Sequence, residues 1–499
     1  MRLSELTATL RCEVIGNGSI DAEVTGIAYD SRAVEKGYLF AAMPGEHVDG
    51  RGFVKAAVDK GASCLLALAP IPDTGVAQVI VPDIRAALSK VSDRFYRSPS
   101  KRLVLVGITG TNGKTTTTYL LESIIKEAGF NPGVIGTVNY RYGGKVFSAP
   151  HTTPQAPDLH RILADMAARG VTHCVMEVSS HSLEQRRVAD CSFRAGIFTN
   201  LTHDHLDYHK TMDEYFRCKS MLFESIAGSG GYSIINTDDP WGERLKAVFS
   251  GAIAYGIKKR GDVFPEEFTL KDGVTEALIR TPEGTVSVSA HLVGEYNLYN
   301  ILAAVGAAVS LGIERGAIER GIASLSRIPG RLEKIEAGSF RAYVDYAHTG
   351  DALERALAAL REISSGRIIT VFGCGGNRDR LKRPKMGEIA TRLSDITVIT
   401  SDNPRDEDPL EITGEIEAGI KGVVRYAHED IFAKGYLVIP DRREAIRKAV
   451  TLAQKGDTVL VAGKGHEDYQ IVKGVKTPFS DFSVLDEAIR ERGGATAAR

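Results

Sequence analysis

The sequence predicts an α/β protein of three domains, and three observations support this fold class. The chain has 499 residues, which is more than one hydrophobic core usually serves. A β-branched run over 103–109 ends at a glycine-rich turn and is followed by a helical pattern that Gly129 closes. From Arg341 onward, strand-like apolar runs alternate with helical patterns, which is typical of a parallel, doubly wound sheet.

Two turns mark the expected domain boundaries. A helix predicted over 84–96 is followed by the turn at 98–100, and a helix predicted over 318–325 is followed by the turn at 328–330. We therefore expect the domains to cover residues 1–100, 101–330 and 331–499.

Composition limits the classes of partner. The 62 basic and 63 acidic residues nearly balance, so no overall field would hold nucleic acid or an anionic membrane. The six cysteines are scattered without a CxxC pair, which indicates reduced thiols. No signal-peptide core occurs, and no apolar run approaches the roughly 20 residues that span a bilayer. We expect a monomeric cytoplasmic protein without nucleic-acid or membrane partners.

A candidate phosphate loop lies where the predicted strand over 103–109 meets the following helix. Backbone N–H groups and the helix dipole would converge there on an anion, and the lysine would add a point charge. The threonine hydroxyl would ligate Mg²⁺. Ile108 stands where the GxxxxGK[ST] motif has its first glycine, so a glycine-rich turn without a ligand is the alternative. The loop consists of Gly110, Thr111, Asn112, Gly113, Lys114 and Thr115.

Two further strand ends carry candidate metal ligands. Glu177 ends the run THCVMEV, and the run AGIFTNL is followed by a segment that contains His203, His205 and His209. Carboxylate oxygen together with imidazole suits Mg²⁺ that is already held by phosphates. A dedicated zinc site is the alternative, although HExxH spacing is absent and no cysteine accompanies these histidines. A hydrogen-bonded structural role is the default for any single histidine.

Lys219 falls within the apolar stripe of a predicted helix that opens with the capping-box residues Thr211 and Glu214. A bare ammonium is costly there, which makes Lys219 a candidate for modification or for a metal-linked role. From the residues alone, snorkelling of the side chain to solvent is the favoured reading.

Taken together, seven segments in this order resemble the Mur ligase family: GTNGKTTT, MEVSSH, TNLTHDHLDYH, FRCKS, EYNLYN, PGRLE and VDYAH. The resemblance covers essentially the whole chain. It implies a UDP-substrate-binding domain, a central ATP-binding domain with a P-loop ATPase-type parallel sheet, and a C-terminal Rossmann-like domain that binds an amino acid. It also implies an ADP-forming, Mg²⁺-dependent amide ligase of peptidoglycan precursor synthesis, with ATP as co-substrate.

The resemblance assigns roles to individual residues. It implies that Lys219 is carbamylated, which would turn a cation into a metal ligand. The implied catalytic residues are Lys114, Glu177, His205 and Lys219, and the implied metal ligands are Thr115, Glu177, His205 and Lys219. ATP contacts beyond the phosphate loop would be Asn297, Asn300, Arg331 and Asp345, for which helix capping and interdomain pairing are the alternatives. Contacts with uridine diphosphate would be Tyr29, Ser31, Glu46, His47 and Val48. Contacts with the muramoyl-dipeptide would be Thr152, Thr153, Ser179, Gln185 and Arg187.

The turn SDNPR resembles the form found in diaminopimelate-adding members of the family. The distal end of meso-diaminopimelate is a zwitterion, so an arginine suits its carboxylate and an acidic side chain suits its ammonium. A solvated turn, a ligase that adds lysine or another amino acid, and a nucleotide-gated binding protein are the alternatives. The base that deprotonates the amine is left open between His205 and His348. The expected contacts are Arg378, Asp402, Asn403, Pro404, Arg405, Gly463 and Glu467.

Overall fold

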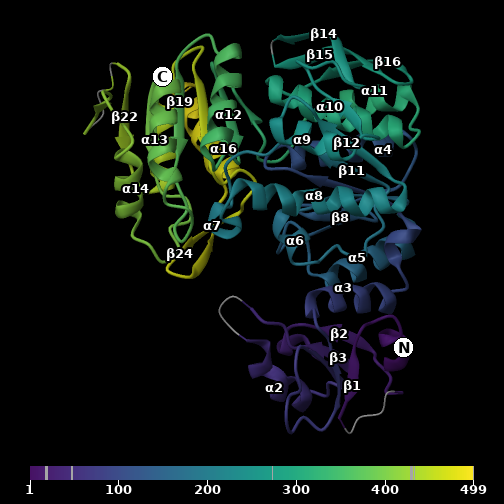
Figure 1. Ribbon diagram of the computed structural model, residues 1–499. Coiled ribbons are helices and arrows are strands. Elements are labelled where there is room, and N and C mark those ends of the chain that lie inside the picture. The colour runs from purple at the N-terminus through teal and green to yellow at the C-terminus, as the bar shows by residue number, and fades with distance from the viewer. Residues whose placement is uncertain (17–20, 46–48, 272, 428–430, 432, 498–499) are drawn as a thin grey trace. The chain divides into compact units, whose positions relative to one another are not determined.

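The computed structural model describes residues 1–16, 21–45, 49–271, 273–427, 431 and 433–497 (Figure 1). Contacts between residues divide the chain into two units. The first unit contains residues 1–109, 129–197 and 217–233, and the second unit contains residues 110–128, 198–216 and 234–499. Within the described residues, no helix is long and apolar enough to cross a membrane.

A five-stranded sheet opens the first unit, in the order β1-β5-β4-β3-β2. The strands from β2 to β5 are parallel, and β1 is an antiparallel edge strand. Apolar side chains from both faces of the sheet form two core clusters. The elements are α1 (Leu3–Thr7), β1 (Glu13–Ile15), β2 (Gly26–Ala28), η1 (Ser31–Ala33), β3 (Tyr38–Ala41), η2 (Gly50–Phe53), α2 (Val54–Asp59), β4 (Cys64–Ala67), β5 (Ala77–Ile80), α3 (Ile84–Phe95) and η3 (Pro99–Arg102).

An eight-stranded sheet follows, in the order β13-β12-β11-β6-β10-β7-β8-β9. Strand β10 pairs in parallel with β6 and β7, which brings the ends of β6 and β10 to the same edge. The division between the two units falls within β11 and β12. The strands are β6 (Val104–Thr109), β7 (Pro132–Ile135), β8 (Tyr140–Tyr142), β9 (Lys145–Phe147), β10 (His173–Glu177), β11 (Ala195–Phe198), β12 (Tyr232–Asn236) and β13 (Ile253–Tyr255).

How deeply the helices of this region are buried follows from how their apolar residues are distributed. The alanine- and leucine-rich α10 is buried nearly all round, as expected for a helix that is apolar on every face. It packs against α4, which also contacts α11. The remaining elements are α4 (Lys114–Glu127), α5 (Ala156–Ala168), α6 (Ser180–Glu184), α7 (Leu206–His209), α8 (Met212–Ser229), α9 (Pro240–Val248), β14 (Phe264–Lys271), β15 (Val274–Thr281), β16 (Gly284–Ala290), α10 (Glu295–Ser310) and α11 (Arg315–Ser324).

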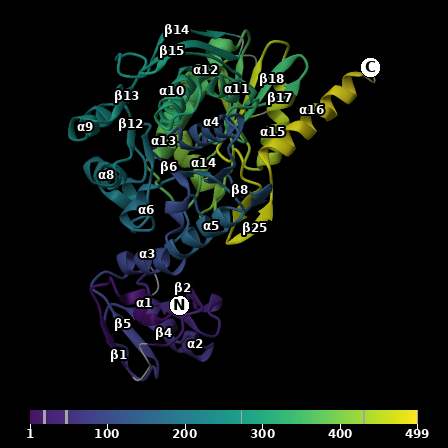
Figure 2. The ribbon, with the colours of Figure 1, turned by 90° about the vertical axis from the view of Figure 1, so that its right-hand side faces the viewer.

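The last sheet has the order β17-β18-β23-β19-β20-β22-β21, and all its neighbouring strands except β17 and β18 are parallel. Helices α12, α13 and α14 contribute to one apolar cluster, and α15 and α16 to another. The ribbon of these five helices is labelled in Figure 2. The elements are β17 (Glu333–Ala337), β18 (Phe340–Asp345), α12 (Gly350–Ile363), β19 (Ile368–Phe372), α13 (Lys382–Leu393), β20 (Ile396–Ile399), α14 (Pro409–Glu417), β21 (Val424–Arg425), β22 (Gly435–Val438), α15 (Arg442–Leu452), β23 (Thr458–Ala462), β24 (Tyr469–Val472), β25 (Val475–Pro478) and α16 (Asp481–Ala497).

The predicted α/β class, with a parallel central sheet and a doubly wound C-terminal sheet, is confirmed. The helix expected over 318–325 begins earlier, at Arg315, because the Glu314 side chain accepts a hydrogen bond from the Gly316 N–H and caps it. The exact domain boundaries stay predictions.

Candidate functional site

The candidate phosphate loop connects β6 to α4 in the expected geometry. Gly110 and Gly113 have φ values of 146° and 90°, a backbone region that side-chain-bearing residues rarely adopt. The Lys114 Nζ donates to the carbonyl oxygens of Gly110 and Thr111 at 2.9 and 2.7 Å. The loop therefore ends in a helix N-terminus with a lysine folded across it, which is an arrangement suited to an anion.

Asn300 lies directly against this loop. A Cβ atom on Gly113 would stand only 2.3 Å from the Asn300 Oδ1, so glycine is required there by packing as well as by backbone conformation. The Asn300 Nδ2 donates to Asn297 Oδ1 at 3.0 Å, and Asn297 Nδ2 donates to the Val293 carbonyl at 2.8 Å. The N-cap of α10 is Gly294, so neither asparagine caps the helix and the capping alternative is wrong.

Arg331 reaches the first turn of α4. Its Nη2 donates to the Thr115 Oγ1 at 3.0 Å, and its guanidinium carbon lies 4.8 Å from the centre of the Tyr346 ring. Asp345 lies nearby, but its two oxygens accept hydrogen bonds from the backbone N–H groups of Leu332 and Ala347 at 2.6 and 2.8 Å. Burial raises the pKa of Asp345, against the lowering effect of Arg331. In this structure Asp345 therefore fixes the turn that carries Arg331.

Asp351 contacts the phosphate loop and was missed by the sequence analysis. Its Oδ2 accepts from the Asn112 Nδ2 at 2.8 Å and lies 3.4 Å from the Thr202 Oγ1. Its Oδ1 accepts from the Arg355 Nε at 3.0 Å. The first turn of α12 is thereby tied to the loop. An acidic residue in a helical first turn is too common a feature to identify such a role from sequence.

A cavity of about 500 Å³ opens beside the phosphate loop, within the second unit. Asp238 stabilises its wall by accepting hydrogen bonds from three successive backbone N–H groups, 257–259, and from the Tyr299 hydroxyl. Trp241, the single tryptophan of the chain, could have signalled a ring-binding surface, yet the sequence analysis passed over it. Residues that line the cavity include Asn112, Gly113, Asp238, Trp241, Tyr299, Asn300 and Arg355.

In the first unit, Glu177 is the centre of a polar network. It is 1% exposed, and its two oxygens accept from the backbone N–H and the hydroxyl of Thr137 at 3.0 and 2.9 Å. The Thr137 hydroxyl lies 3.0 Å from that of Thr152. Thr153 Oγ1 donates to the Glu177 carbonyl at 2.8 Å and accepts from the Ser179 N–H at 3.1 Å.

The same network extends to the remaining residues expected near the muramoyl-dipeptide. The Arg187 Nη1 donates to the Thr153 carbonyl at 2.9 Å, and its Nη2 donates to Gln185 Oε1 at 2.7 Å. The structure thus brings together five residues that the sequence analysis grouped, namely Thr152, Thr153, Ser179, Gln185 and Arg187.

The expected uridine diphosphate contacts are only partly described. Tyr29 donates through its hydroxyl to the Asp158 Oδ2 at 2.7 Å, and burial followed by this hydrogen bond raises the pKa of Tyr29. Ser31 is the first residue of η1, which the Asp30 side chain caps. The predicted contacts Glu46, His47 and Val48 lie outside the described residues.

Lys219 lies on α8 and is 1% exposed. A side chain that snorkels would reach solvent, so this degree of burial contradicts the snorkelling alternative. The expected metal ligands divide between the units: Glu177 and Lys219 belong to the first, and Thr115 and His205 to the second. Their common site stays a prediction.

The histidine-rich segment lies mostly at the surface of the second unit. His205 is exposed, has a left-handed φ of 54° and holds its Nε2 3.4 Å from the Asp204 Oδ2. Burial raises the pKa of Asp204, but His205, His348 and Lys382 outweigh it and hold that pKa below its usual range. His203 lies 3.8 Å from Asp379.

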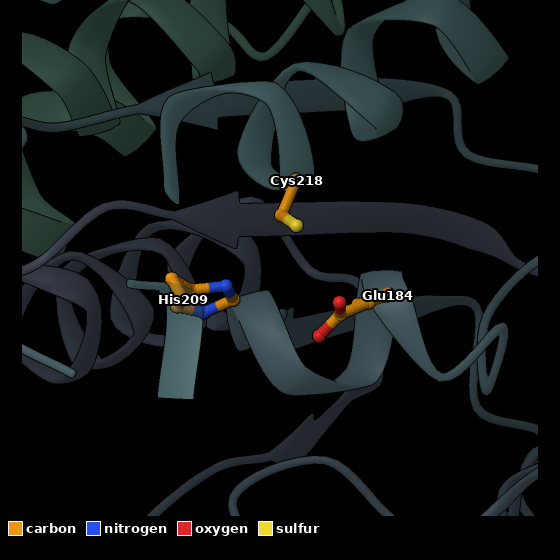
Figure 3. A group of neighbouring side chains, drawn as sticks. All are labelled: Glu184, His209 and Cys218. Atoms are coloured by element: carbon orange, nitrogen blue, oxygen red, sulfur yellow. The ribbon is translucent and has the colours of Figure 1, made fainter. Parts of the chain in front are cut away.

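Figure 3 shows Glu184, His209 and Cys218, which carry atoms able to ligate a metal. Glu184 and Cys218 belong to the first unit and His209 to the second. We therefore assign no metal site to this group, and the zinc alternative gains no support from it.

The loops that follow the strands of the C-terminal sheet adjoin one another, as is typical of a parallel, doubly wound sheet. The Asn403 Nδ2 donates to Glu467 Oε2 at 2.8 Å, and the Arg405 Nη1 donates to the Gly376 carbonyl at 2.7 Å. Gly463 has a φ of 119°, and a Cβ there would stand 2.7 Å from the Asp402 Oδ2. Burial, followed by the charge of the exposed Arg378, lowers the pKa of Arg405.

A buried ion pair lies next to these loops. Arg442 and Asp481 are both fully buried and share two hydrogen bonds of 2.7 Å. Arg442 also donates to the carbonyls of Ser401, two residues beyond the end of β20, and of Ala462, the last residue of β23. It was missed because its partner lies 39 residues away.

Three profiles of one protein family match the chain. They describe the Mur ligase family catalytic domain over residues 23–96, the Mur ligase middle domain over 108–308, and the Mur ligase glutamate ligase domain over 330–465. The chain belongs to the Mur ligase family. The resemblance inferred from sequence motifs is confirmed.

This Mur ligase is similar over nearly its full length to proteins named UDP-N-acetylmuramoyl-L-alanyl-D-glutamate–2,6-diaminopimelate ligase. The protein of that name from Geobacter metallireducens is 46% identical over 98% of this chain and 99% of its own length. The one from Geobacillus thermodenitrificans is 41% identical over 99% and 100%. A solved structure of such a ligase has a TM-score of 0.69 and 30% identity over 99% of each chain.

Proposed function

We propose that this Mur ligase joins meso-2,6-diaminopimelate to the D-glutamyl γ-carboxylate of UDP-N-acetylmuramoyl-L-alanyl-D-glutamate, with conversion of ATP to ADP and phosphate. Relatives of that name at 41–46% identity over nearly the whole chain carry the assignment. The phosphate loop, its adjoining cavity and the adjoining charged loops of the C-terminal sheet support it. This reaction belongs to peptidoglycan precursor synthesis, and a cytoplasmic location stays a prediction.

ATP is assigned to the second unit. The phosphates would lie on the N-terminus of α4, where backbone N–H groups and Lys114 offset their charge. The cavity lined by Trp241 and Tyr299 would take the base, because it opens beside the loop and offers aromatic walls. Arg331 would face the phosphate chain from its position against Thr115.

The reaction would proceed in two steps. An oxygen of the γ-carboxylate attacks the γ-phosphorus as the bond from that phosphorus to the β,γ-bridging oxygen breaks, which yields an acyl phosphate and ADP. The neutral amine of diaminopimelate then attacks the acyl carbon, and phosphate leaves as the tetrahedral intermediate collapses to the amide. Lys114 stabilises the charge on the transferred phosphoryl group. His205 and His348 are the two candidates for the base that takes the amine's proton.

The donors proposed for magnesium suit a hard cation. Glu177 provides a buried carboxylate whose geometry Thr137 fixes, and Thr115 provides a hydroxyl at the start of α4. The carbamate of Lys219 would add a further oxygen ligand, which would also explain a lysine that is 1% exposed. The proposal that Thr115, Glu177, His205 and Lys219 ligate Mg²⁺ rests on the family resemblance, and Mg²⁺ would neutralise phosphate charge during transfer.

The UDP-muramoyl-dipeptide is assigned to the first unit. The network of Thr152, Thr153, Ser179, Gln185 and Arg187 presents hydroxyl, amide and guanidinium groups close to Glu177. Its position beside Glu177 supports it as the site of the peptide, with the uridine diphosphate end near Tyr29 and Ser31.

ADP release across candidate amines tests the proposal. Full-length protein with Mg-ATP and UDP-muramoyl-dipeptide should release ADP rapidly only when meso-diaminopimelate is added, and mass spectrometry should find the tripeptide product. If lysine or glutamate were preferred, the protein would instead be a Mur ligase that adds that amino acid. Slow ATP turnover that neither co-substrate accelerates would indicate a nucleotide-gated binding protein.

A further inference from the structure

Lys464 has a buried ammonium that the proposed reaction does not yet use. It lies in the loop after β23, and its side chain is 0% exposed. Its Nζ lies 2.9 Å from Glu467 Oε2, 3.1 Å from Asn403 Oδ1 and 3.8 Å from Asp402 Oδ1. All three acceptors belong to residues assigned to diaminopimelate. Lysine is rarely buried unless it is paired, so this position calls for an explanation.

The ammonium fixes the orientation of two of these side chains. Asn403 Oδ1 accepts from Lys464 and from the Ile471 N–H at 3.0 Å, while its Nδ2 donates to Glu467 Oε2 at 2.8 Å. Glu467 Oε2 therefore takes two hydrogen bonds from the protein. The other carboxylate oxygen, Oε1, is not used by these bonds. Glu467 can present that oxygen to a ligand in one defined orientation.

Lys464 also changes the charge of the residues assigned to diaminopimelate. In that set the carboxylates of Asp402 and Glu467 balance the guanidinium groups of Arg378 and Arg405, and Lys464 adds one positive charge beside it. A ligand end that carries only an ammonium is disfavoured by that excess. A zwitterionic end is not, because its carboxylate is attracted while its ammonium pairs with Glu467.

We propose that Lys464 is a positioning and specificity-determining residue, whose buried ammonium orients Asn403 and Glu467 and favours amino acids with a zwitterionic far end over those with a cationic one. The inference rests on the proposed function and deepens it. Lys464 acts through its neighbours and need not touch the substrate. From the loop GKGHE that contains Lys464, only Gly463 and Glu467 were predicted from sequence to contact the amino acid.

The test compares two amines in full-length protein with Lys464→Met. Initial rates of ADP release are measured with saturating UDP-muramoyl-dipeptide while meso-diaminopimelate or L-lysine is varied. We expect kcat/KM for diaminopimelate to fall by about 10-fold to 100-fold, mainly through KM, because a charged hydrogen-bond donor is lost. The ratio of the two kcat/KM values should fall by about tenfold or more. The KM for ATP should stay within about twofold of wild type, since among the described residues the Lys464 ammonium pairs with Asn403, Glu467 and Asp402.

Lys476→Met is the matched control. Lys476 is an exposed lysine that lies 3.7 Å from the centre of the Tyr469 ring, and Lys464 lies 5.4 Å from the same ring. It should behave like wild type with both amines. Lys464→Gln keeps a hydrogen-bond donor without the charge. It should show the same fall in the ratio of kcat/KM for diaminopimelate to kcat/KM for lysine, and it keeps the test possible if Lys464→Met does not fold.

The outcomes separate this inference from the proposed function. Suppose that the wild-type protein adds diaminopimelate and that both Lys464 variants keep its preference for diaminopimelate over lysine within about twofold. That result would overturn the role of Lys464 and leave the proposed function intact. A wild-type protein that accepts neither amine would overturn the proposed function itself.

Discussion

The Arg331 Nη2 lies 3.0 Å from the Thr115 Oγ1, which joins the turn before β17 to the first turn of α4. The two residues are 216 positions apart in the chain. Arg331 is held in place from its other side by the Tyr346 ring, and the adjoining turn is fixed by Asp345. This contact places a permanent cation at the phosphate loop, beside the hydroxyl proposed to serve the metal.

Replacing Arg331 by alanine should impair the use of ATP. We expect kcat/KM for ATP to fall by about 10-fold to 100-fold, because a charged donor to the phosphates is lost. Arg320→Ala is the control, since Arg320 is an exposed arginine on α11 that pairs with Glu127 at 3.5 Å. Unchanged ATP kinetics in the Arg331 variant would remove it from the nucleotide site.

Lys114→Met should abolish turnover more completely than any other single change in the loop. A loss of about 1000-fold or more in kcat is expected, because the transferred phosphoryl group loses its nearest point charge. Lys126→Met, which alters an exposed lysine on the same helix, should keep wild-type rates. If the Lys114 variant kept a tenth of the activity, ATP would have to bind in another way.

Lys219→Ala tests the proposed carbamate. The variant should be inactive, and formate or acetate should restore part of the rate by supplying a carboxylate in the space of the lost side chain. Arg217, an exposed residue two positions earlier on α8, gives the control Arg217→Ala, which should retain activity without added anions. Full activity of Lys219→Ala would contradict a carbamate ligand.

Nucleotide binding should be visible in the intrinsic fluorescence of the unmodified protein. Trp241 is the single tryptophan and lines the cavity beside the phosphate loop, so a bound base would alter its surroundings. Titration with ADP should change the emission and saturate at the affinity that calorimetry gives. Calorimetric binding without any change in emission would place the base outside this cavity.

Acid should lower the folding stability of the C-terminal region through Glu407, which lies in the loop between β20 and α14. Its hydrogen bonds with Arg383 lower the pKa of Glu407 to about 2, below the unfolded value of about 4.3. The pair therefore stabilises the fold fully above the unfolded pKa, and that contribution is lost as pH falls from about 4 to 2.

In Glu407→Gln the loss of folding stability between about pH 4 and pH 2 should be smaller than in wild type. Its free energy of unfolding at pH 7 should be lower by about 1–3 kcal/mol, because the fully buried Arg383 loses one of the two carboxylates that it pairs with among the described residues and keeps Glu415. Melting temperatures across pH check this, with the exposed Glu411→Gln as control. If the melting temperatures of wild type and Glu407→Gln changed in parallel with pH, the pair of Glu407 and Arg383 would not contribute to acid sensitivity.

Features set by local pattern were predictable from the sequence. The strand, glycine loop and helix from β6 to α4 follow from hydrophobic period and turn chemistry, and the alternation from β18 to β23 indicated a parallel sheet whose loops meet. Lys219 could be singled out because a charge interrupted an apolar stripe.

Contacts between distant segments could not be predicted in this way. Asp351 meets Asn112 across 239 positions, and Lys464 meets Asn403 across 61. Only the folded sheet brings these partners together, and no local pattern distinguishes Asp351 from other acids near helix starts. The motif resemblance supplied the roles of Arg331 and Asp345, but only the structure shows that Asp345 is occupied by backbone donors.

Isotope transfer from the substrate carboxylate to phosphate tests the central claim most directly. UDP-muramoyl-dipeptide labelled with ¹⁸O in its D-glutamyl γ-carboxylate would be turned over with Mg-ATP and meso-diaminopimelate, and the released phosphate analysed by mass spectrometry. An acyl phosphate formed at the loop from Gly110 to Thr115 requires one labelled oxygen in each phosphate. Phosphate free of the label would mean that water, rather than the carboxylate, receives the phosphoryl group.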